Sequence, residues 1–202
     1  MRGDTLRYLF IDSSTSYLIL SLIIDNDVKY YYNECVSKDM SSIIMVKIEE
    51  AFDKCKIKPS NLNGIFVVNG PGSFTGIRVG LTVAKVMAYT LNIPLFKLSS
   101  LEVMTSGFDT KVMALINARR GYVFAGGYEN LIPFYKDSYV LLDDVKGYDY
   151  VSYDDLDVHT ILPKVDILKV INKHKNDLPV NPHSLNPNYL KLTEAEEKLK
   201  HD

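Results

Sequence analysis

The sequence of 202 residues predicts an α/β fold made of two subdomains. The first observation is residues 65–91, where an apolar strand pattern leads through a glycine-rich loop into a helical pattern. The second is a group of three apolar segments before residue 34, which is typical of an antiparallel β-meander. The third is a further group of β-patterned segments between residues 111 and 153. We therefore expect an N-terminal subdomain over 1–103 and a second, smaller one over 104–186.

From composition and charge we expect a soluble, cytoplasmic protein. Apolar residues make up 47% of the chain, which is enough for a core, and no apolar run approaches the ~18 residues of a membrane span. The N-terminus, with Asp4 and Asp12, has no signal-peptide pattern. Basic residues number 23 and acidic residues 25, so no overall basic field would hold RNA. Cys35 and Cys55 lack Cys-x-x-Cys spacing, which favours a reducing compartment.

The elements of the first subdomain follow from period-2 and helical patterns in turn. In order, the segments are strands at 6–11, 16–24 and 28–33, a helix at 39–54, a strand at 65–68, a helix at 77–91 and a strand at 95–98. The first three are rich in Ile, Leu, Val and Tyr and are separated by short polar turns. The apolar positions of the first helix are Ile44, Ile48, Ala51, Phe52 and Cys55.

The turn after the first strand, Asp12-Ser13-Ser14-Thr15, combines a carboxylate with three hydroxyl groups. Such a turn can surround a metal-bound phosphate. The alternative is an Asx turn, in which the aspartate accepts hydrogen bonds from its own backbone, and spacing alone favours this second interpretation.

The glycine-rich loop at residues 70–76 has two interpretations of its own. Its glycines keep side chains away from the N–H groups at the start of the next helix, where a phosphate could bind. Alternatively, they only make the turn between strand and helix. The pattern Gly-x-Gly-x-x-x-Gly is one residue longer than the dinucleotide fingerprint and lacks the Gly-Lys ending of a P-loop. The residues assigned to a weak or vestigial nucleotide site are Asp12, Ser13, Ser14, Gly70, Gly72, Ser73, Thr75 and Gly76.

The second subdomain begins after a predicted short helix. Ser99 and Glu102 have the spacing of a capping box, which predicts a helix that ends near Gly107. The later segments are strands at 111–117 and 122–128, β segments at 139–142 and 148–153, a helix at 167–175 and a linker at 176–187. The pair Gly126-Gly127 lies inside a strand pattern and indicates a bulge or a close backbone approach. A second capping-box spacing, Thr193 with Glu196, predicts a terminal helix within 187–202 that returns to the first subdomain.

Residues 69–81, together with Ile11-Asp12-Ser13-Ser14, are similar to the TsaB (YeaZ) family. Residues 117–124 and 187–190 resemble two later family segments. The resemblance implies the actin-like, Hsp70-like ATPase fold (ribonuclease H-like), with mixed sheets. It also implies a protein that supports a TsaD-like catalytic subunit, with a TsaE-like ATPase, in making threonylcarbamoyladenosine on tRNA, and that forms a homodimer when alone.

The sequence departs from the family pattern at two places. Family members often carry His-Ser-Glu where this chain has Met40-Ser41-Ser42, and an acid where it has Asn117. The second Asp-Gly phosphate loop and the Gly-Gly adenosine loop of ATP-cleaving superfamily members are also missing. The four histidines show no i, i+4 pair that would hold a metal on a helix. We therefore predict no catalytic residue, no metal and no cofactor of its own, with ATP or ADP at the joint with the partner.

Three hypotheses about function follow. The favoured one is a catalytically silent partner in tRNA threonylcarbamoylation, which meets tRNA only indirectly. The alternative is an ATP-dependent small-molecule kinase or ATPase of the actin-like fold, which Asp12 and the glycine loop keep open. The third is a self-associating module with no connection to tRNA.

The helix after the glycine loop predicts a surface for a partner. Its polar side chains form one stripe, while Gly80, Ala84 and Ala88 recur every four residues and would leave a flat track for another helix. The first helix has surplus apolar groups of its own. The predicted interface residues are Ile43, Val46, Arg78, Gly80, Leu81, Ala84 and Ala88. On this interpretation Ala84→Arg would give a folded monomer; the alternative is that the track packs against the chain's own first helix.

Overall fold

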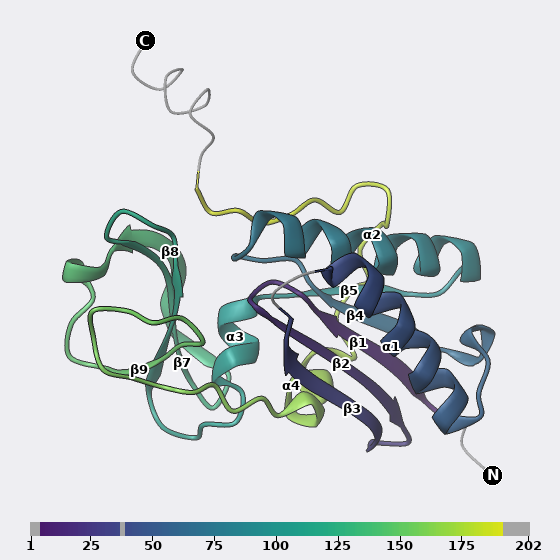
Figure 1. The fold of residues 1–202 in the computed structure, drawn as a ribbon. Coiled ribbons are helices and arrows are strands. Elements are labelled where there is room, and N and C mark those ends of the chain that lie inside the picture. Colours follow the sequence, from purple (N-terminus) through teal and green to yellow (C-terminus); the bar gives the residue numbers. More distant parts are fainter. Residues whose placement is uncertain (1–4, 37–38, 192–202) are drawn as a thin grey trace.

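The computed structural model describes residues 5–36 and 39–191, which form two five-stranded sheets with helices (Figure 1). The first sheet is built from residues before 99 and the second from residues 112–161. The predicted α/β class with mixed sheets is therefore confirmed. In the described part of the chain, no helix is both long and apolar enough to cross a membrane.

The first sheet has the strand order β3-β2-β1-β4-β5. Its strands are β1 (Arg7–Asp12), β2 (Tyr17–Ile24), β3 (Asp27–Cys35), β4 (Gly64–Val68) and β5 (Leu95–Leu98). The first three pair antiparallel, as the meander pattern predicts, while β4 pairs parallel to β1 and β5 parallel to β4. Because β1, β4 and β5 run parallel, the segments that follow these three strands lie at the same edge of the sheet.

Helices cover both faces of the first sheet. The helices are α1 (Met40–Cys55), α2 (Phe74–Leu91), α3 (Ser100–Thr105) and α4 (Ile167–His174), with short 3₁₀ turns at Pro59–Asn61 and Leu142–Asp144. Side chains of α1 and α2 share one buried cluster with Leu9, Ile11 and Leu20 of the sheet. Side chains of α3 and α4 share the cluster on the opposite face, around Phe10 and Phe66.

The second sheet has the order β10-β9-β6-β7-β8. Its strands are β6 (Val112–Asn117), β7 (Tyr122–Glu129), β8 (Ile132–Leu141), β9 (Asp149–Val151) and β10 (Thr160–Ile161). Strand β8 begins at Ile132, whereas the predicted segment begins only at Tyr139. The first half of β8 contains Pro133 and lacks a regular alternation of apolar and polar residues, so its sequence does not predict a strand. An edge strand such as β8 tolerates both features. The predicted irregularity at Gly126-Gly127 is confirmed, because the β7–β8 register shifts there.

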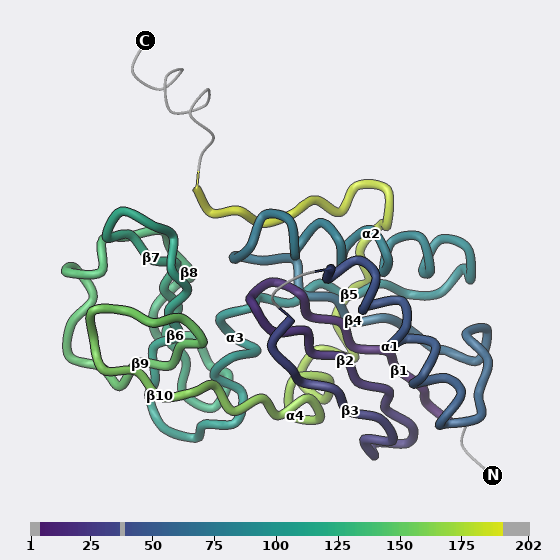
Figure 2. The backbone as a smooth tube through the Cα atoms, in the orientation of Figure 1, coloured from purple at the N-terminus to yellow at the C-terminus, as the bar shows by residue number. Residues whose placement is uncertain are grey.

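Helix α4 follows the second sheet in sequence but packs on the first (Figure 2). Its buried residues Ile167, Val170 and Ile171 join the cluster that contains Phe10. Packing thus places α4 with the first sheet, whereas its position in the sequence predicts it in the second subdomain. The predicted terminal helix begins beyond residue 191 and lies outside the described residues.

The capping box predicted at Ser99 and Glu102 is only half formed. Ser99 Oγ accepts a hydrogen bond from the Leu101 N–H at 3.2 Å, so Ser99 is the N-cap. Glu102 turns away to Lys173 Nζ at 2.5 Å and His174 Nε2 at 3.1 Å, both at the end of α4. A tertiary ion pair therefore replaces the local bond that the spacing predicted.

The small-residue track on α2 is not exposed, and this part of the predicted interface is wrong. Ala84 and Ala88 are 0% and 1% exposed and lie in the core beneath the helix. A Cβ atom on Gly80 would overlap Ser13 Oγ, and Leu81 is buried as well. Small residues recurring every four positions mark a close approach to another element, but they do not say which one, and here it is the chain's own sheet.

Ala84→Arg is therefore expected to unfold the protein instead of producing a folded monomer. The substitution would bury an unpaired charge in the core, at a cost of several kcal/mol, which is comparable with the whole stability of a domain. Thermal unfolding followed by circular dichroism will measure this loss of stability. Thr82→Arg on the exposed side of α2 is the control, and a folded Ala84→Arg with the stability of that control would contradict the buried placement.

The ion pairs of His174 predict a loss of stability at alkaline pH. Its hydrogen bond with Glu102, followed by that with Asp177, raises the pKa of the imidazole above its ordinary value, although burial opposes the shift. The stabilisation is fully present below the unfolded pKa of about 6.5 and is lost as the pH rises through the folded pKa.

Urea unfolding between about pH 6 and about pH 9 should show this decline in the native chain. His174→Gln keeps a polar side chain without the titration, so its stability should change less over that range. Equal pH profiles for the two proteins would show that His174 does not contribute. Lys173, which also contacts Glu102, is common to both proteins.

Candidate functional site

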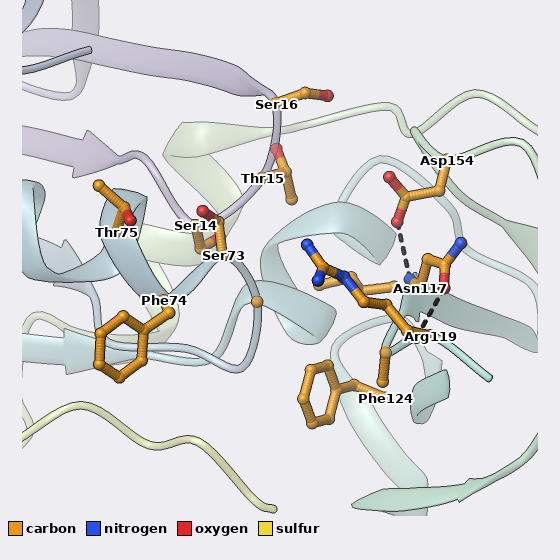
Figure 3. A pocket seen from close by; sticks show the side chains of 13 residues that line it. Ser14, Thr15, Ser16, Ser73, Phe74, Thr75, Asn117, Arg119, Phe124 and Asp154 are labelled. Carbon is orange, nitrogen blue, oxygen red and sulfur yellow. Dashed lines mark hydrogen bonds between the residues drawn. The ribbon is translucent and has the colours of Figure 1, made fainter. Parts of the chain in front are cut away.

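A cleft of about 470 Å³ lies between the two sheets (Figure 3). One wall is formed by the turn after β1 and the glycine loop, and the other by the β6–β7 turn with the loop after β9. The lining residues are Ser14, Thr15, Ser16, Gly72, Ser73, Phe74, Thr75, Ile116, Asn117, Ala118, Arg119, Phe124 and Asp154. The walls come from segments that are distant in sequence, so the cleft exists only in the folded chain.

The glycines of the loop are required by the chain's own packing. A Cβ on Gly72 would overlap the Ser14 carbonyl oxygen, and one on Gly76 would overlap the Ser13 carbonyl oxygen. Gly70 is occluded in the same way by the carbonyl oxygen of Asn188. The close approach is held by a hydrogen bond from Ser73 N–H to the Ser14 carbonyl at 2.6 Å. Protein backbone therefore occupies the space beside these glycines in which a phosphate was one of the two predicted occupants.

Asp12 adopts the Asx turn that spacing alone favoured. Its Oδ1 accepts hydrogen bonds from Ser14 N–H at 2.8 Å and from Ser14 Oγ at 2.6 Å. The side chain is 2% exposed, and burial raises the pKa of its carboxyl to about 6, although the bonds from Ser14 oppose the shift. Asp12 stabilises its own turn and does not line the cleft.

The predicted nucleotide residues divide into two groups. Ser14, Gly72, Ser73 and Thr75 line the cleft, whereas Asp12, Ser13, Gly70 and Gly76 lie behind its wall. Ser73 is the N-cap of α2, and its Oγ accepts a hydrogen bond from Gly76 N–H at 3.2 Å. The hydroxyl groups of Ser73 and Thr75 can donate a hydrogen bond to a group in the cleft. Nucleotide binding by these residues stays a prediction.

The second wall contains residues that were not among the predicted site residues. Arg119 projects its guanidinium into the cleft, opposite Ser14 and Ser73 (Figure 3). Asn117 orients this turn, because its Oδ1 accepts from Arg119 N–H at 2.8 Å and its own N–H donates to Asp154 Oδ2 at 2.7 Å. Arg119 and Arg120 both have left-handed backbone, with φ of 69° and 55°.

The signal for these residues was present in residues 117–124, which carried the family resemblance, but no pattern said that they face the first turn. The amide of Asn117 serves where the family has an acid, as the acceptor for the turn. Within the residues that the structure describes, no group of three His, Cys, Asp or Glu side chains could hold a metal ion. Hydroxyl donors on one wall and a guanidinium on the other suit an anionic group.

A second surface feature is an apolar groove of about 670 Å³ between α1 and α2. Its walls include Met45, Val46 and Val86, which are 51%, 58% and 59% exposed. Of the predicted interface residues, Val46 lines this groove, Ile43 is half-buried, and Arg78 lines a neighbouring depression near the start of α2. The two predicted helices therefore do present apolar surface, but through side chains other than the small ones.

Comparisons with known proteins give the family. Residues 32–190 match the family model described as "TsaD: tRNA N6-adenosine threonylcarbamoyltransferase". The chain is 30% identical to the tRNA threonylcarbamoyladenosine biosynthesis protein TsaB of Bacillus subtilis, over 94% of this chain and 96% of that protein. It is 28% identical to TsaB of Escherichia coli over 61% of this chain and 55% of the relative.

A solved structure described as YeaZ from Pseudomonas aeruginosa shares the fold, with a TM-score of 0.75 at 20% identity, and covers 92% of this chain and 100% of its own. Together with the match to the TsaD family model, this likeness confirms the actin-like, ribonuclease H-like fold that the resemblance to the TsaB family implies. The near-complete match to the Bacillus relative carries the family assignment. The chain belongs to the TsaB (YeaZ) family of tRNA threonylcarbamoyladenosine biosynthesis proteins.

Proposed function

We propose that this protein is a non-catalytic partner in tRNA threonylcarbamoyladenosine biosynthesis, where it supports a TsaD-type catalytic subunit. The observation that carries the proposal is the 30% identity to a TsaB protein over nearly the whole of both chains. The match to a TsaD family model adds that this chain and the transferase share ancestry. Shared ancestry favours pairing, because related subunits offer similar helical faces to each other.

Two carboxylates near the cleft are already committed to structural bonds, which supports catalytic silence. Asp12 accepts both of its local hydrogen bonds inside the Asx turn. Asp154 accepts the N–H of Asn117. A general base must reach the proton that it removes, and Asp12, which is 2% exposed, does not line the cleft.

The groove between α1 and α2 is the surface that we assign to the catalytic subunit. Its exposed apolar side chains lie on neighbouring helices, so two helices of a partner could pack there as a four-helix joint. When the chain is alone, a second copy occupies the same groove as a homodimer. A TsaE-like ATPase joins the assembly, and tRNA is held through the catalytic subunit, which agrees with the balanced charge of this chain.

The function is tested by reconstitution. Purified chain, a TsaD-type subunit and a TsaE-like ATPase are combined with tRNA and the threonylcarbamoyl donor, and the modified nucleoside is measured by mass spectrometry. Omitting this chain should abolish the product. Undiminished product without the chain would overturn the proposal, and tight, salt-sensitive tRNA binding by the chain alone would overturn the indirect role.

Val86→Glu should disrupt the partner joint while the subunit stays folded. The side chain of Val86 is 59% exposed in the free chain, so a charge is tolerated there. Burying that charge in the joint should weaken association, and each 1.4 kcal/mol of burial cost lowers the affinity about tenfold. Sedimentation will measure homodimer formation, and a pull-down will measure binding of the TsaD-type subunit. Ile132→Glu, at an equally apolar and 68% exposed position on β8, is the matched control. If both variants associate alike, the joint lies elsewhere.

We also propose that ATP or ADP binds weakly in the cleft and more tightly in the complex. Arg119→Ala should lower the affinity for ADP by about tenfold, because a charge-assisted hydrogen bond is lost. Arg120→Ala removes a neighbouring arginine that does not line the cleft and should have little effect. Calorimetry measures binding, and ATP turnover by the isolated chain should stay far below about 1 per second. Equal losses in both arginine variants would contradict binding at the cleft.

A further inference from the structure

The segment at residues 186–191 touches both subdomains at the side of the cleft. It follows the linker after α4 and passes along α2 toward the second sheet (Figure 1). None of its contacts is needed for the proposed partner role, so the inference below is independent of that role.

The first half of the segment is fixed to the first subdomain. Asn188 N–H donates to the Asn69 carbonyl at 2.7 Å, directly before the glycine loop. The ring of Tyr189 stacks on Phe74, with 5.1 Å between centroids and 21° between planes. The Tyr189 hydroxyl accepts a hydrogen bond from Arg78 Nε at 2.8 Å, and the guanidinium also lies 3.8 Å above the Phe74 ring.

The next two residues are fixed to the second subdomain. Leu190 packs against the buried cluster that contains Ile116 and Phe124. Lys191 Nζ lies 5.4 Å from the ring centroid of Tyr139, which belongs to the same group of side chains. Leu190 has φ of 52°, a left-handed conformation that leucine disfavours and that the contacts on both sides must hold in place.

These attachment points are the walls of the cleft themselves. Phe74 lines it from the first subdomain, and Ile116 and Phe124 line it from the second. Two successive residues, Tyr189 and Leu190, therefore each hold one wall. We propose that residues 186–191 act as a clasp that sets the opening of the cleft.

The clasp is one of several contacts between the subdomains. Tyr17 stacks on Tyr153 with 4.2 Å between centroids, and Ser99 Oγ donates to Asp137 at 2.5 Å. Tyr17 is the first residue of β2, Ser99 is the N-cap of α3 and Asp137 lies in β8, so these contacts belong to the helices and strands of the two layers. The clasp lies on a segment after the last described helix, so its release requires no change in either sheet. Release would let the subdomains rotate about the other contacts and widen the cleft.

The test is the distance between the two walls in solution. Spin labels are attached at Ser42→Cys on α1 and Arg120→Cys in the β6–β7 turn, in a chain with Cys35→Ser and Cys55→Ser. Both label positions are exposed. Electron–electron dipolar spectroscopy then gives the distance distribution. Tyr189→Ala removes the first attachment, and Leu190→Gly removes the second while suiting the left-handed backbone. Each should shift the distribution to longer distances and broaden it.

His183→Ala is the matched control. It removes an aromatic contact between the same linker and Tyr89 of α2, but it touches no part of the second subdomain, so its distances should equal those of the native chain. Circular dichroism confirms folding of each variant. If Tyr189→Ala does not fold, Leu190→Gly decides. Native distances in a folded clasp variant, or an equal shift in His183→Ala, would overturn the proposal.

Discussion

The structure depends on the contact between the glycine loop and the turn after β1. Gly72 and Gly76 lie against the carbonyl oxygens of Ser14 and Ser13, closer than any side chain would permit. This contact fixes where α2 begins relative to β1, and the helix in turn carries one side of the apolar groove and one wall of the cleft. Backbone-to-backbone packing of this kind tolerates no Cβ, so it couples the positions of both surfaces to four residues.

Much of the first subdomain could be predicted from sequence because its signals are local. Alternating apolar residues and polar turns gave the meander, and a strand, glycines and a helical period gave the β4–α2 unit. The buried side of α2 could not be read in the same way. Its circumference is nearly all apolar or small, and periodicity says that Ala84 is packed without saying against what. Strand β8 was seen only in part because an edge strand needs no regular pattern.

The candidate site was half predictable for a related reason. Ser14, Ser73 and Thr75 lie beside turn signals that sequence displays, whereas Arg119, Phe124 and Asp154 reach the cleft only through the packing of the second sheet. Asp12 shows the limit of residue type as a guide. A carboxylate at a strand end is a good ligand for a metal or a donor group in principle. Here the N–H and the hydroxyl of Ser14, only two residues along the chain, already donate hydrogen bonds to Asp12 Oδ1. Phe74 lines both the cleft and the depression near the start of α2, so the cleft and that depression meet at one ring.

The occluded glycines change how natural and laboratory variants of this protein should be interpreted. In a genetic screen, alanine at Gly72 or Gly76 would inactivate the protein, and the positions would be taken for a nucleotide motif. Here the same phenotype arises from a steric clash with the chain's own carbonyl groups, with no ligand involved. Intolerance to substitution at this loop therefore reports on folding, and only residues such as Arg119, whose side chain ends in open space, report on what the cleft binds.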